Sequence, residues 1–184
     1  FNEVLQNLWW KLDRALTLED CGISALVPLL SAIRAGTTTL VDHHASPNAV
    51  RGSLQKIAES VKQSGLRAAL CYEVSDRDGE KIAAEGLAEN AQFIRECRAA
   101  RNEHLAALFG LHASFTVGDA TLDKAVKLAK EAGSGFHVHA AEAKSDQDHC
   151  QKEYGKRVVE RFYEHRVLGP NTLLAHGVHL SSKE

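Results

Sequence analysis

Residues 135–142 read Gly-Phe-His-Val-His-Ala-Ala-Glu, an apolar stretch that carries two histidines and ends in a carboxylate. This composition is typical of a buried β-strand that gives way to a loop. Successive side chains of a strand point to opposite faces, so we expect His137 and His139 to share one face. Neutral imidazole binds metal ions, and a carboxylate such as Glu142 can move protons to and from a metal-bound water. The stretch therefore predicts a chemically active strand end.

Apolar, β-branched runs alternate with segments of helical spacing in the rest of the chain. Further strands are predicted at residues 37–42, 66–74, 105–111 and 172–175. Helices are predicted at residues 18–35, 46–64, 82–101, 120–132 and 144–165, with a kink or break at Pro28 and a weak point at Gly155. Thr17 and Asp20 resemble a capping box at the start of the first helix. Residues 1–16 are mixed and aromatic, and we expect a loop and a short helix that cover an opening.

Strands that alternate with helices indicate parallel βαβ units and an α/β protein. Such units build either a doubly wound open sheet or part of a (β/α)8 barrel. No GxGxxG fingerprint or P-loop follows any predicted strand, which weakens the nucleotide-binding open sheet. Polar residues gather at the carboxyl ends of the strands, where barrel active sites lie. Since five strands cannot close a barrel, the prediction is a (β/α)8 TIM-barrel segment, an incomplete barrel within one domain.

Composition excludes several classes of protein. The 184 residues carry a net charge of -2 and no long basic run, so we expect no nucleic-acid partner. No apolar run is long enough to span a bilayer and no secretory signal is visible, so we expect no membrane association. Four well-separated cysteines without a CxxC pair are typical of free thiols in a reducing compartment, which predicts a cytoplasmic location. The absence of methionine and the ends of the chain suggest a piece of a longer protein.

Histidines end four of the predicted strands. Burying an unpartnered polar ring costs about 1–3 kcal/mol, so these rings need a function or a partner. His139 is the candidate metal ligand, Glu142 the candidate proton-transfer group, and His112 and His176 the further candidates; the alternatives are satisfied core histidines and a solvated loop carboxylate.

Other residues have weaker claims on a site. His43 and His44 are adjacent, so only one can point inward. The pair Asp76-Arg77 could meet a substrate or be a solvated loop pair, and Cys71 is most simply a buried apolar residue. We expect His149, in polar helical sequence, at the surface.

Four motifs, taken together and in this order, resemble the amidohydrolase superfamily: GTTTLVDHH (36–44), LFGLHASFT (108–116), FHVHAAEAKSD (136–146) and LLAHGVHL (173–180). The nearer resemblance is to its branch of ring deaminases and chlorohydrolases, and CYEVSDRDG (71–79) with GKRVVERF (155–162) looks most like the SsnA-type aminohydrolases. The resemblance implies a (β/α)8 barrel with a small β-sandwich domain and one divalent metal, zinc in preference to iron.

Site roles follow from the resemblance, position by position. His139 matches the metal ligand on the family's fifth strand, and Glu142 the carboxylate that shuttles protons. His176 matches the sixth-strand histidine that orients or polarises the attacked group, and His112 a substrate-binding histidine on the fourth strand. The family's first-strand HxH pair and eighth-strand aspartate have no match in residues 1–184. The chain thus resembles strands two to six, the central part of one barrel domain, without the β-sandwich and the remaining strands.

The sequence therefore predicts a metal-dependent hydrolase of the aminohydrolase, deaminase or chlorohydrolase type. Metal-activated water would attack a C–N or C–Cl bond of a small, nitrogen-heterocyclic substrate. We expect the segment alone to be inactive, to bind metal weakly or not at all, and to associate through open strand edges, and the full-length protein to be a homo-oligomer. Two alternatives remain: a non-catalytic α/β binding module, and a barrel lyase, which would need a Schiff-base lysine that no predicted strand carries.

Overall fold

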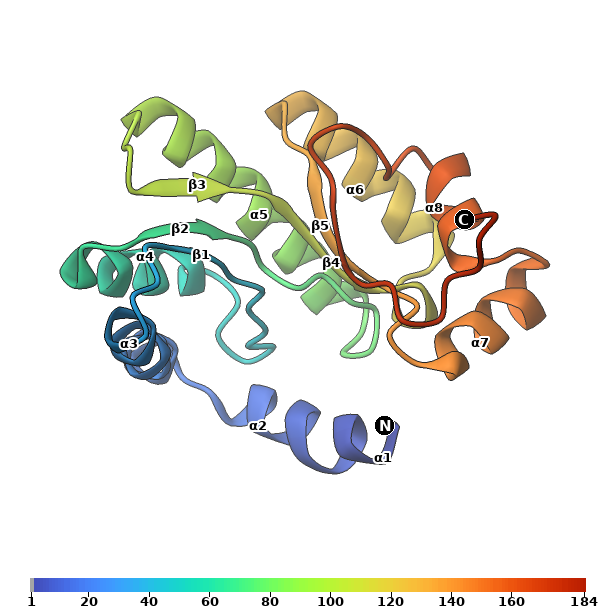
Figure 1. Ribbon diagram of the computed structural model, residues 1–184, viewed down its shortest axis with the longest axis horizontal. Helices are drawn as coiled ribbons and strands as arrows, with labels where there is room; N and C mark the ends of the chain where they lie inside the picture. Colours follow the sequence, from blue (N-terminus) through green and yellow to red (C-terminus); the bar gives the residue numbers. More distant parts are fainter. Residues whose placement is uncertain (1) are drawn as a thin grey trace.

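A wall of parallel strands forms the centre of the protein in the computed structural model, which describes residues 2–184 (Figure 1). The strands are β1 (Thr39–Val41), β2 (Arg67–Leu70), β3 (Leu105–Ala107), β4 (Phe109–Ala113), β5 (Phe136–Ala140) and β6 (Leu173–His176). They pair in the orders β1-β2-β3 and β4-β5-β6. Because β3 and β4 are consecutive parts of one chain segment interrupted at Leu108, the wall corresponds to five strands of a barrel.

A seam in this wall lies between the end of β2 and the start of β4. Leu108 N donates to Leu70 O (3.1 Å), Val74 N donates to Gly110 O (3.3 Å), and His112 N donates to Val74 O (2.9 Å). These bonds continue the parallel pairing past the regular ladder of β2 and β3. The two groups of three strands therefore form one continuous surface.

Asn90 replaces the missing ladder bonds at the seam. Its side-chain oxygen accepts from Tyr72 N, and its amide donates to Tyr72 O, both at 2.8 Å, and to Gly110 O at 3.3 Å. A Cβ atom on Gly110 would lie only 2.2 Å from Tyr72 O, so only glycine permits this close approach. A buried amide and a glycine together hold the two halves of the wall.

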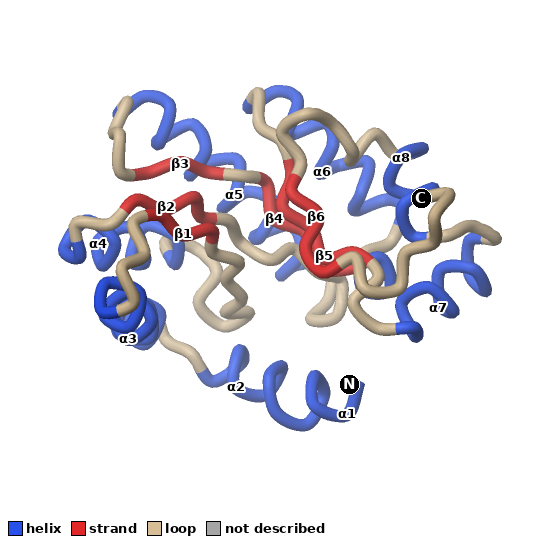
Figure 2. The backbone as a smooth tube through the Cα atoms, in the orientation of Figure 1, coloured by secondary structure: helices blue, strands red, loops and turns tan. Residues whose placement is uncertain are grey.

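Helices cover the outer face of the wall, and the strands lie inside them (Figure 2). The helices are α3 (Leu18–Arg34), α4 (Ser53–Ser64), α5 (Glu80–Ala100), α6 (Asp119–Ala132), α7 (Lys144–Tyr154) and α8 (Val158–Glu164). α4 shows the usual reason for this packing, because Leu54, Ile57, Ala58 and Val61 recur at helical spacing and are buried. The core therefore lies between the helices and the outward-facing side chains of the strands.

The amino-terminal arm crosses below the carboxyl ends of the strands in Figure 1. It consists of α1 (Asn2–Val4), a π-helical turn η1 (Leu5–Trp9) and α2 (Trp10–Ala15). The arm is helical throughout residues 2–15, whereas the sequence predicted a loop and a short helix; Phe1 lies outside the described residues. The capping box is also confirmed, since Thr17 Oγ1 accepts from Asp20 N and the Asp20 carboxylate accepts from Thr17 N.

Several predicted boundaries were wrong. α4 begins at Ser53 rather than residue 46, because a turn closed by Ala49 N and Ser46 O and a left-handed Gly52 (φ 82°) precede it. α3 runs through Pro28 without a break. Proline removes one hydrogen bond of the helix there, and the neighbouring Leu29 is buried.

Two further elements also have boundaries that differ from the prediction. Residues 144–165 form two helices, α7 and α8, separated at the left-handed Gly155 (φ 67°), so Gly155 is a break and not only a weak point. The strand predicted at residues 105–111 is interrupted at Leu108 and continues to Ala113. His112 therefore lies within β4, beside a register shift between Leu111 and Ala113.

Within residues 2–184, no single helix is both long and apolar enough to cross a membrane. One sharply bent pair, residues 2–15 with residues 18–34, passes that test by length and composition alone.

Candidate functional site

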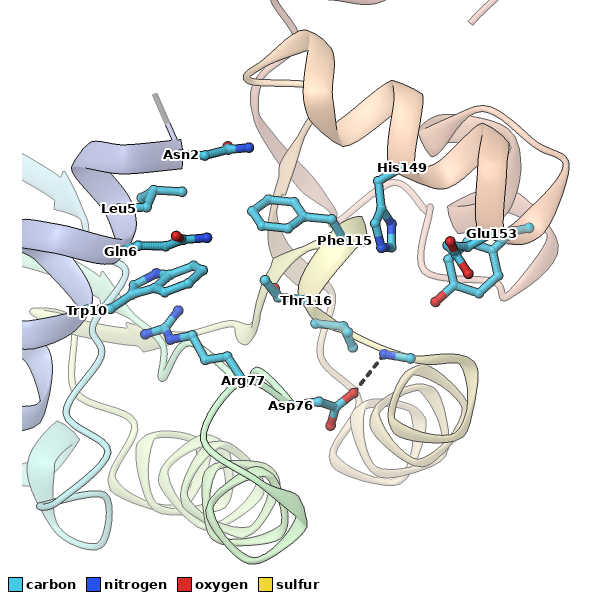
Figure 3. A pocket seen from close by; sticks show the side chains of 13 residues that line it. Asn2, Leu5, Gln6, Trp10, Asp76, Arg77, Phe115, Thr116, His149 and Glu153 are labelled. Carbon is cyan, nitrogen blue, oxygen red and sulfur yellow. Dashed lines mark hydrogen bonds between the residues drawn. The ribbon is translucent and has the colours of Figure 1, made fainter.

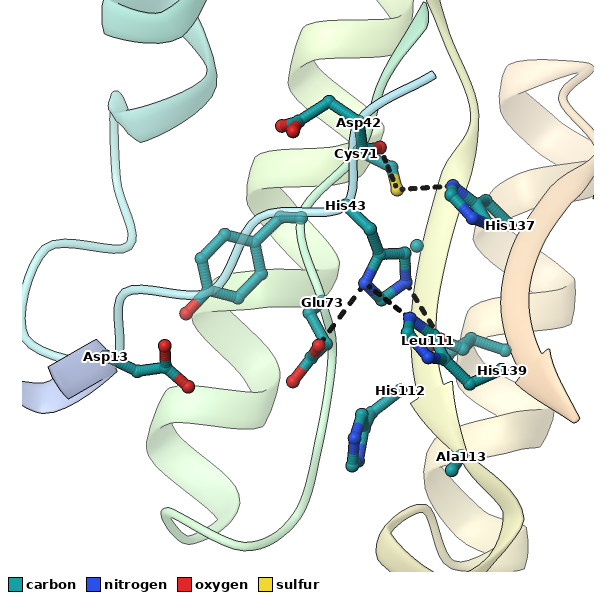
Figure 4. A network of polar contacts seen from close by, with 12 residues as sticks. Asp13, Asp42, His43, Cys71, Glu73, Leu111, His112, Ala113, His137 and His139 are labelled. Atoms are coloured by element: carbon teal, nitrogen blue, oxygen red, sulfur yellow. Dashed lines mark hydrogen bonds and ion pairs between the residues drawn. The ribbon is translucent and has the colours of Figure 1, made fainter. Parts of the chain in front are cut away.

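Three imidazole rings form a row across the carboxyl ends of the strands, and Figure 4 shows two of them, His43 and His139. His139 Nε2 lies 3.2 Å from His43 Nδ1, and His176 Nε2 lies 2.9 Å from His139 Nδ1. His43 follows β1, His139 is on β5 and His176 ends β6, so the row joins both halves of the wall. The sequence predicted His139 and His176 as site residues, and the structure places their rings in contact.

One proton position in this row follows from its end. His43 Nε2 lies 3.1 Å from Leu111 O, and a carbonyl can only accept, so this nitrogen carries a proton. His43 Nδ1 faces both His139 Nε2 (3.2 Å) and an oxygen of Glu73 (3.3 Å), so its protonation decides the direction of the other contacts in the row. Burial, followed by the nearby His43, lowers the pKa of His139 to about 3. His139 is therefore neutral near pH 7, the state that a metal ligand needs.

Glu142 lies at the open end of the row. Its Oε2 is 3.4 Å from His176 Nε2 and 3.9 Å from His139 Nδ1. The side chain is 33 % exposed, so it contacts both the histidines and solvent. A carboxylate in this position can exchange protons with a bound water and with bulk solvent.

Glu73 lies at the buried end of the row. Its Oε2 is 3.3 Å from His43 Nδ1, and its other oxygen accepts from Arg77. Burial alone would raise the pKa of Glu73, but His112, His43 and Arg77 outweigh it and hold that pKa well below the usual value. Glu73 therefore stays ionised near neutral pH.

His112 forms one wall of the site and is buried. Its Nδ1 lies 2.6 Å from Thr116 Oγ1, and that hydroxyl donates to Ala113 O (3.2 Å). Thr116 therefore accepts from His112 Nδ1, and the free lone pair of the ring is on Nε2. Burial is the largest influence that lowers the pKa of His112, to about 4. The register shift in β4 is a bulge of the kind that re-aims a side chain next to a site.

His137 shares the inner face of β5 with His139, as the alternation predicted. Their rings are stacked, with centroids 6.2 Å apart and planes 9° apart. His137 Nδ1 lies 3.6 Å from Cys71 Sγ, and burial raises the pKa of this thiol well above its usual value. Cys71 is thus a neutral, buried thiol, which agrees with the prediction of a buried residue.

The backbone is strained at two of these strand ends. Ala141 (φ 51°) and His176 (φ 72°) adopt left-handed conformations that non-glycine residues rarely take. Hydrogen bonds hold both: Ala141 N donates to the Asp146 carboxylate, and Gly177 N donates to Ala140 O. Strain of this type costs about 1–3 kcal/mol and clusters at functional sites.

The donor atoms fit a divalent metal ion. Among the described residues, three groups of three side chains have ligand atoms within 4.8 Å of one another: His43, Cys71 and His137; His43, Glu73 and His139; and His139, Glu142 and His176. Imidazole nitrogens and carboxylate oxygens are ligands that zinc and iron accept. His139 belongs to two of these groups, as does His43, and the role of His139 as a metal ligand stays a prediction.

In the sequence, His43 was only one of two alternative candidates, and Glu73 was given no role in the site. The sequence placed both near strand ends, but an adjacent pair such as His43-His44 does not reveal which ring points inward. The structure shows that His43 does, while His44 lies 2.9 Å from Ser46 Oγ and packs edge-on against Tyr72. His149 was also misjudged, since its Nδ1 is buried and the residue lines a cavity.

Comparison with known proteins agrees with this geometry. The model of the Amidohydrolase family matches residues 6–184. A 5'-deoxyadenosine deaminase from Methanosarcina barkeri is 31 % identical over 172 residues, which are 94 % of this chain and 38 % of that protein. Among solved structures, an adenosine deaminase from Xanthomonas campestris with bound zinc superposes with a TM-score of 0.85 at 20 % identity, over 98 % of this chain and 40 % of that one.

A second solved structure belongs to the chlorohydrolases. The atrazine chlorohydrolase from Arthrobacter aurescens, complexed with zinc, superposes with a TM-score of 0.74 at 15 % identity, over 99 % of this chain and 43 % of that one. The chain thus spans about two fifths of the length of these proteins, and the predicted incomplete barrel is confirmed. Because the family model matches nearly the whole chain, this protein belongs to the amidohydrolase family.

Proposed function

We propose that this chain is the central part of a metal-dependent hydrolase that removes an amino group from a nitrogen heterocycle. The observation that carries the proposal is the convergence of His139, His176 and Glu142 at the carboxyl ends of β5 and β6. A deaminase among the curated relatives and zinc in two structural neighbours support it.

Each side chain would have one task. A divalent ion, zinc rather than iron, held through His139 would lower the pKa of water toward about 7 and so supply the nucleophile. Glu142 would accept the proton of that water and deliver it to the leaving nitrogen. His176, in contact with Glu142, would hydrogen-bond the group under attack. His112 would accept a hydrogen bond from the substrate at Nε2, the nitrogen that Thr116 leaves free.

We further propose that the β-sandwich domain and the remaining barrel strands belong to the full-length gene product. The open edges of β1 and β6 and the two-fifths coverage of relatives support this. Homo-oligomerisation is supported by the exposed Ile23, Val27 and Leu30 on α3. A cytoplasmic location is supported by the four cysteines, all free.

Substitution of the proton-transfer group tests the proposal. Glu142→Gln in the full-length gene product removes the group that accepts and returns the proton, a contribution of about 10²–10⁴-fold. We expect turnover of 5'-deoxyadenosine or adenosine to fall by at least roughly 100-fold. The matched control is Glu131→Gln, an exposed carboxylate on α6, which should leave turnover unchanged. Near-wild-type turnover in Glu142→Gln would contradict the assignment.

Metal content gives a second test. We expect about one zinc per full-length chain by elemental analysis, and little in the 184-residue chain, because only one of the ligands that the family resemblance implies lies within it. A full-length protein that takes up neither zinc nor iron would instead favour a non-catalytic binding module.

A further inference from the structure

The turn η2 (Ser114–Thr116), which follows β4, is held by a buried arginine. Arg161 on α8 donates to Ser114 O (2.8 Å), to Ser114 Oγ (2.9 Å) and to Val117 O (2.8 Å). Arg161 is itself 1 % exposed and pairs with the Asp119 carboxylate. The main chain of η2 therefore has a defined position, to which other parts of the site can be attached.

One side of η2 is open. Phe115 and Thr116 line a cavity of about 690 Å³, together with the amino-terminal arm, the loop after β2 and α7 (Figure 3). The buried side-chain nitrogens and oxygens without a hydrogen-bond partner in residues 2–184 are Trp10 Nε1, Arg77 Nε and His149 Nδ1, and all three residues line this cavity. Because packing is incomplete on this side, hydrogen bonds are the main constraint on η2 there.

Asp146, in the first turn of α7, links η2 to the end of β5. Its Oδ1 accepts from Phe115 N (3.1 Å), and its Oδ2 accepts from Ala141 N (3.0 Å). The residue is only 2 % exposed. Burial raises the pKa of this carboxyl, and the two N–H donors oppose that rise. Each oxygen thus holds the main chain beyond a different strand, β4 or β5.

Ala141 turns the chain from β5 toward Glu142. Its φ of 51° is left-handed, a conformation that is unfavourable for alanine. Its N–H donates to Asp146, and its carbonyl accepts from His179 N (2.9 Å). Without the bond to Asp146, Ala141 would be free to relax toward an ordinary conformation, and the next residue, Glu142, would move with it.

The position of the Glu142 carboxylate depends on this backbone. Its Oε2 lies 3.4 Å from His176 Nε2 and 3.9 Å from His139 Nδ1, longer than the roughly 2.7–3.2 Å of ordinary hydrogen bonds. The side chain is also 33 % exposed, so its own contacts hold it weakly. Proton transfer requires hydrogen-bond distances, and a displacement of about 1 Å can lower a rate about 100-fold.

We propose that Asp146 is a positioning residue for proton transfer: it ties the strained end of β5 to η2 and so holds Glu142 at the histidine row. This inference rests on the proposed function and adds to it a residue that does not touch the substrate. Asp146 acts through Ala141 on the side of Glu142, and through Phe115 on the side of the fixed turn.

The kinetics of Asp146→Asn in the full-length gene product test the proposal. Asparagine keeps the shape of aspartate, but its amide nitrogen cannot accept, so either Ala141 N or Phe115 N loses its acceptor. With 5'-deoxyadenosine as substrate, we expect kcat to fall roughly 10- to 100-fold while KM changes less than about 3-fold. A folded Asp146→Asn variant with kcat within about 2-fold of wild type would overturn the proposal.

The matched control is Asp148→Asn. Asp148 lies on the same helix, its side chain is 60 % exposed, and it pairs with Lys144 at the surface. This substitution makes the same chemical change away from the strand ends, so kcat and KM should both stay unchanged.

A double-substitution cycle separates positioning from a simple loss of folded protein. If Asp146 acts through Glu142, Asp146→Asn should lower the residual turnover of Glu142→Gln by less than about 2-fold, because the group that it positions is already absent. A loss of folded protein would lower turnover by the same factor in both backgrounds. An equal factor would therefore overturn the proposal.

Asp146→Ser replaces Asp146→Asn in this cycle if the asparagine variant does not fold. Its single oxygen cannot reach both main-chain N–H groups, and it places no amine against them. We expect the same fall in kcat, again confined to the background that retains Glu142.

The two proposals fail in different ways. Near-wild-type turnover in Glu142→Gln would reject the catalytic assignment and, with it, the role of Asp146. A large loss of turnover in Glu142→Gln, with equal factors for Asp146→Asn in both backgrounds, would reject the role of Asp146 alone.

Discussion

Two buried arginines, Arg161 on α8 and Arg77 after β2, have different surroundings. Arg161 is 1 % exposed and donates from Nε and both terminal nitrogens, to the Asp119 carboxylate, Ser114 O and Oγ, and Val117 O. Its guanidinium carbon also lies 3.7 Å from the centre of the Tyr154 ring. Every nitrogen of this guanidinium has a partner inside the protein.

Arg77, in contrast, has one guanidinium nitrogen without a hydrogen-bond partner. Its terminal nitrogens donate to Glu73 and Asp13, but Nε has no hydrogen-bond partner and the residue lines the large cavity. The difference distinguishes an arginine that stabilises the fold from one that is available to bind a ligand. A fully satisfied guanidinium holds loops together, whereas one with a spare donor at a cavity wall is available to a ligand.

Alanine substitution should have the largest effect at both positions. Arg161→Ala leaves the carbonyls of Ser114 and Val117 without donors, and Arg77→Ala leaves the buried Glu73 charge without its main partner. We expect each to lower the free energy of unfolding by about 3–5 kcal/mol, measured by urea denaturation. A loss below about 1 kcal/mol at either position would show that the contacts of that arginine contribute little to the stability of the fold.

Lysine substitution should separate the two. Lysine offers one charged group instead of a planar fork, so Arg161→Lys cannot replace five donor contacts and should cost about 1–3 kcal/mol. Arg77→Lys keeps a cation beside Glu73 and should cost less than about 1 kcal/mol. The same denaturation measurement checks both variants. Equal losses of stability would contradict the view that the two arginines differ in how far the fold depends on their donors.

The smallest effect concerns pH. Burial first, then Glu73 and Asp78, raises the pKa of Asp13, a partner of Arg77, to about 6. Because the unfolded pKa is near 3.9, the folded state binds more protons between about pH 4 and 6, so this group adds stability as pH falls through that window.

Half-buried His44 acts on stability in the opposite direction. Burial lowers its pKa to about 4, so the unfolded state binds more protons below about pH 6.5 and stability falls on acidification. Asp13→Asn should therefore lose stability more steeply than wild type between pH 6 and 4, measured by denaturation of chelator-treated protein at each pH. Parallel curves would show that Asp13 does not titrate in this window.

The sequence predicted the order of strands and helices well, because the spacing of apolar residues and the glycines that end helices are local properties of the chain. His139, Glu142 and His176 were also found, since strand-end position and motif resemblance are both visible in one dimension. Whether these residues have the proposed roles awaits the experiments above.

Properties that depend on register were not predictable. The inward turn of His43, the contact of Glu73 with it, and the interruption at Leu108 arise from the pairing of distant strands. The three unpartnered nitrogens are a further case, because Trp10, Arg77 and His149 come from separate segments and meet only in the folded chain. No pattern in the sequence indicates which donor will lack a hydrogen-bond partner in the folded chain.

The seam closed by Asn90 has a consequence for cooperative unfolding. His43 and Glu73 lie on one side of it, and His139, Glu142 and His176 lie on the other. The two sides are separate candidates for local opening, joined across the seam by few main-chain bonds. Anything that binds both sides at the histidine row opposes this opening, so the amide hydrogens of Leu108, Val74 and His112 should exchange with solvent more slowly when the site is filled. The site then also stabilises the barrel wall in which it is built.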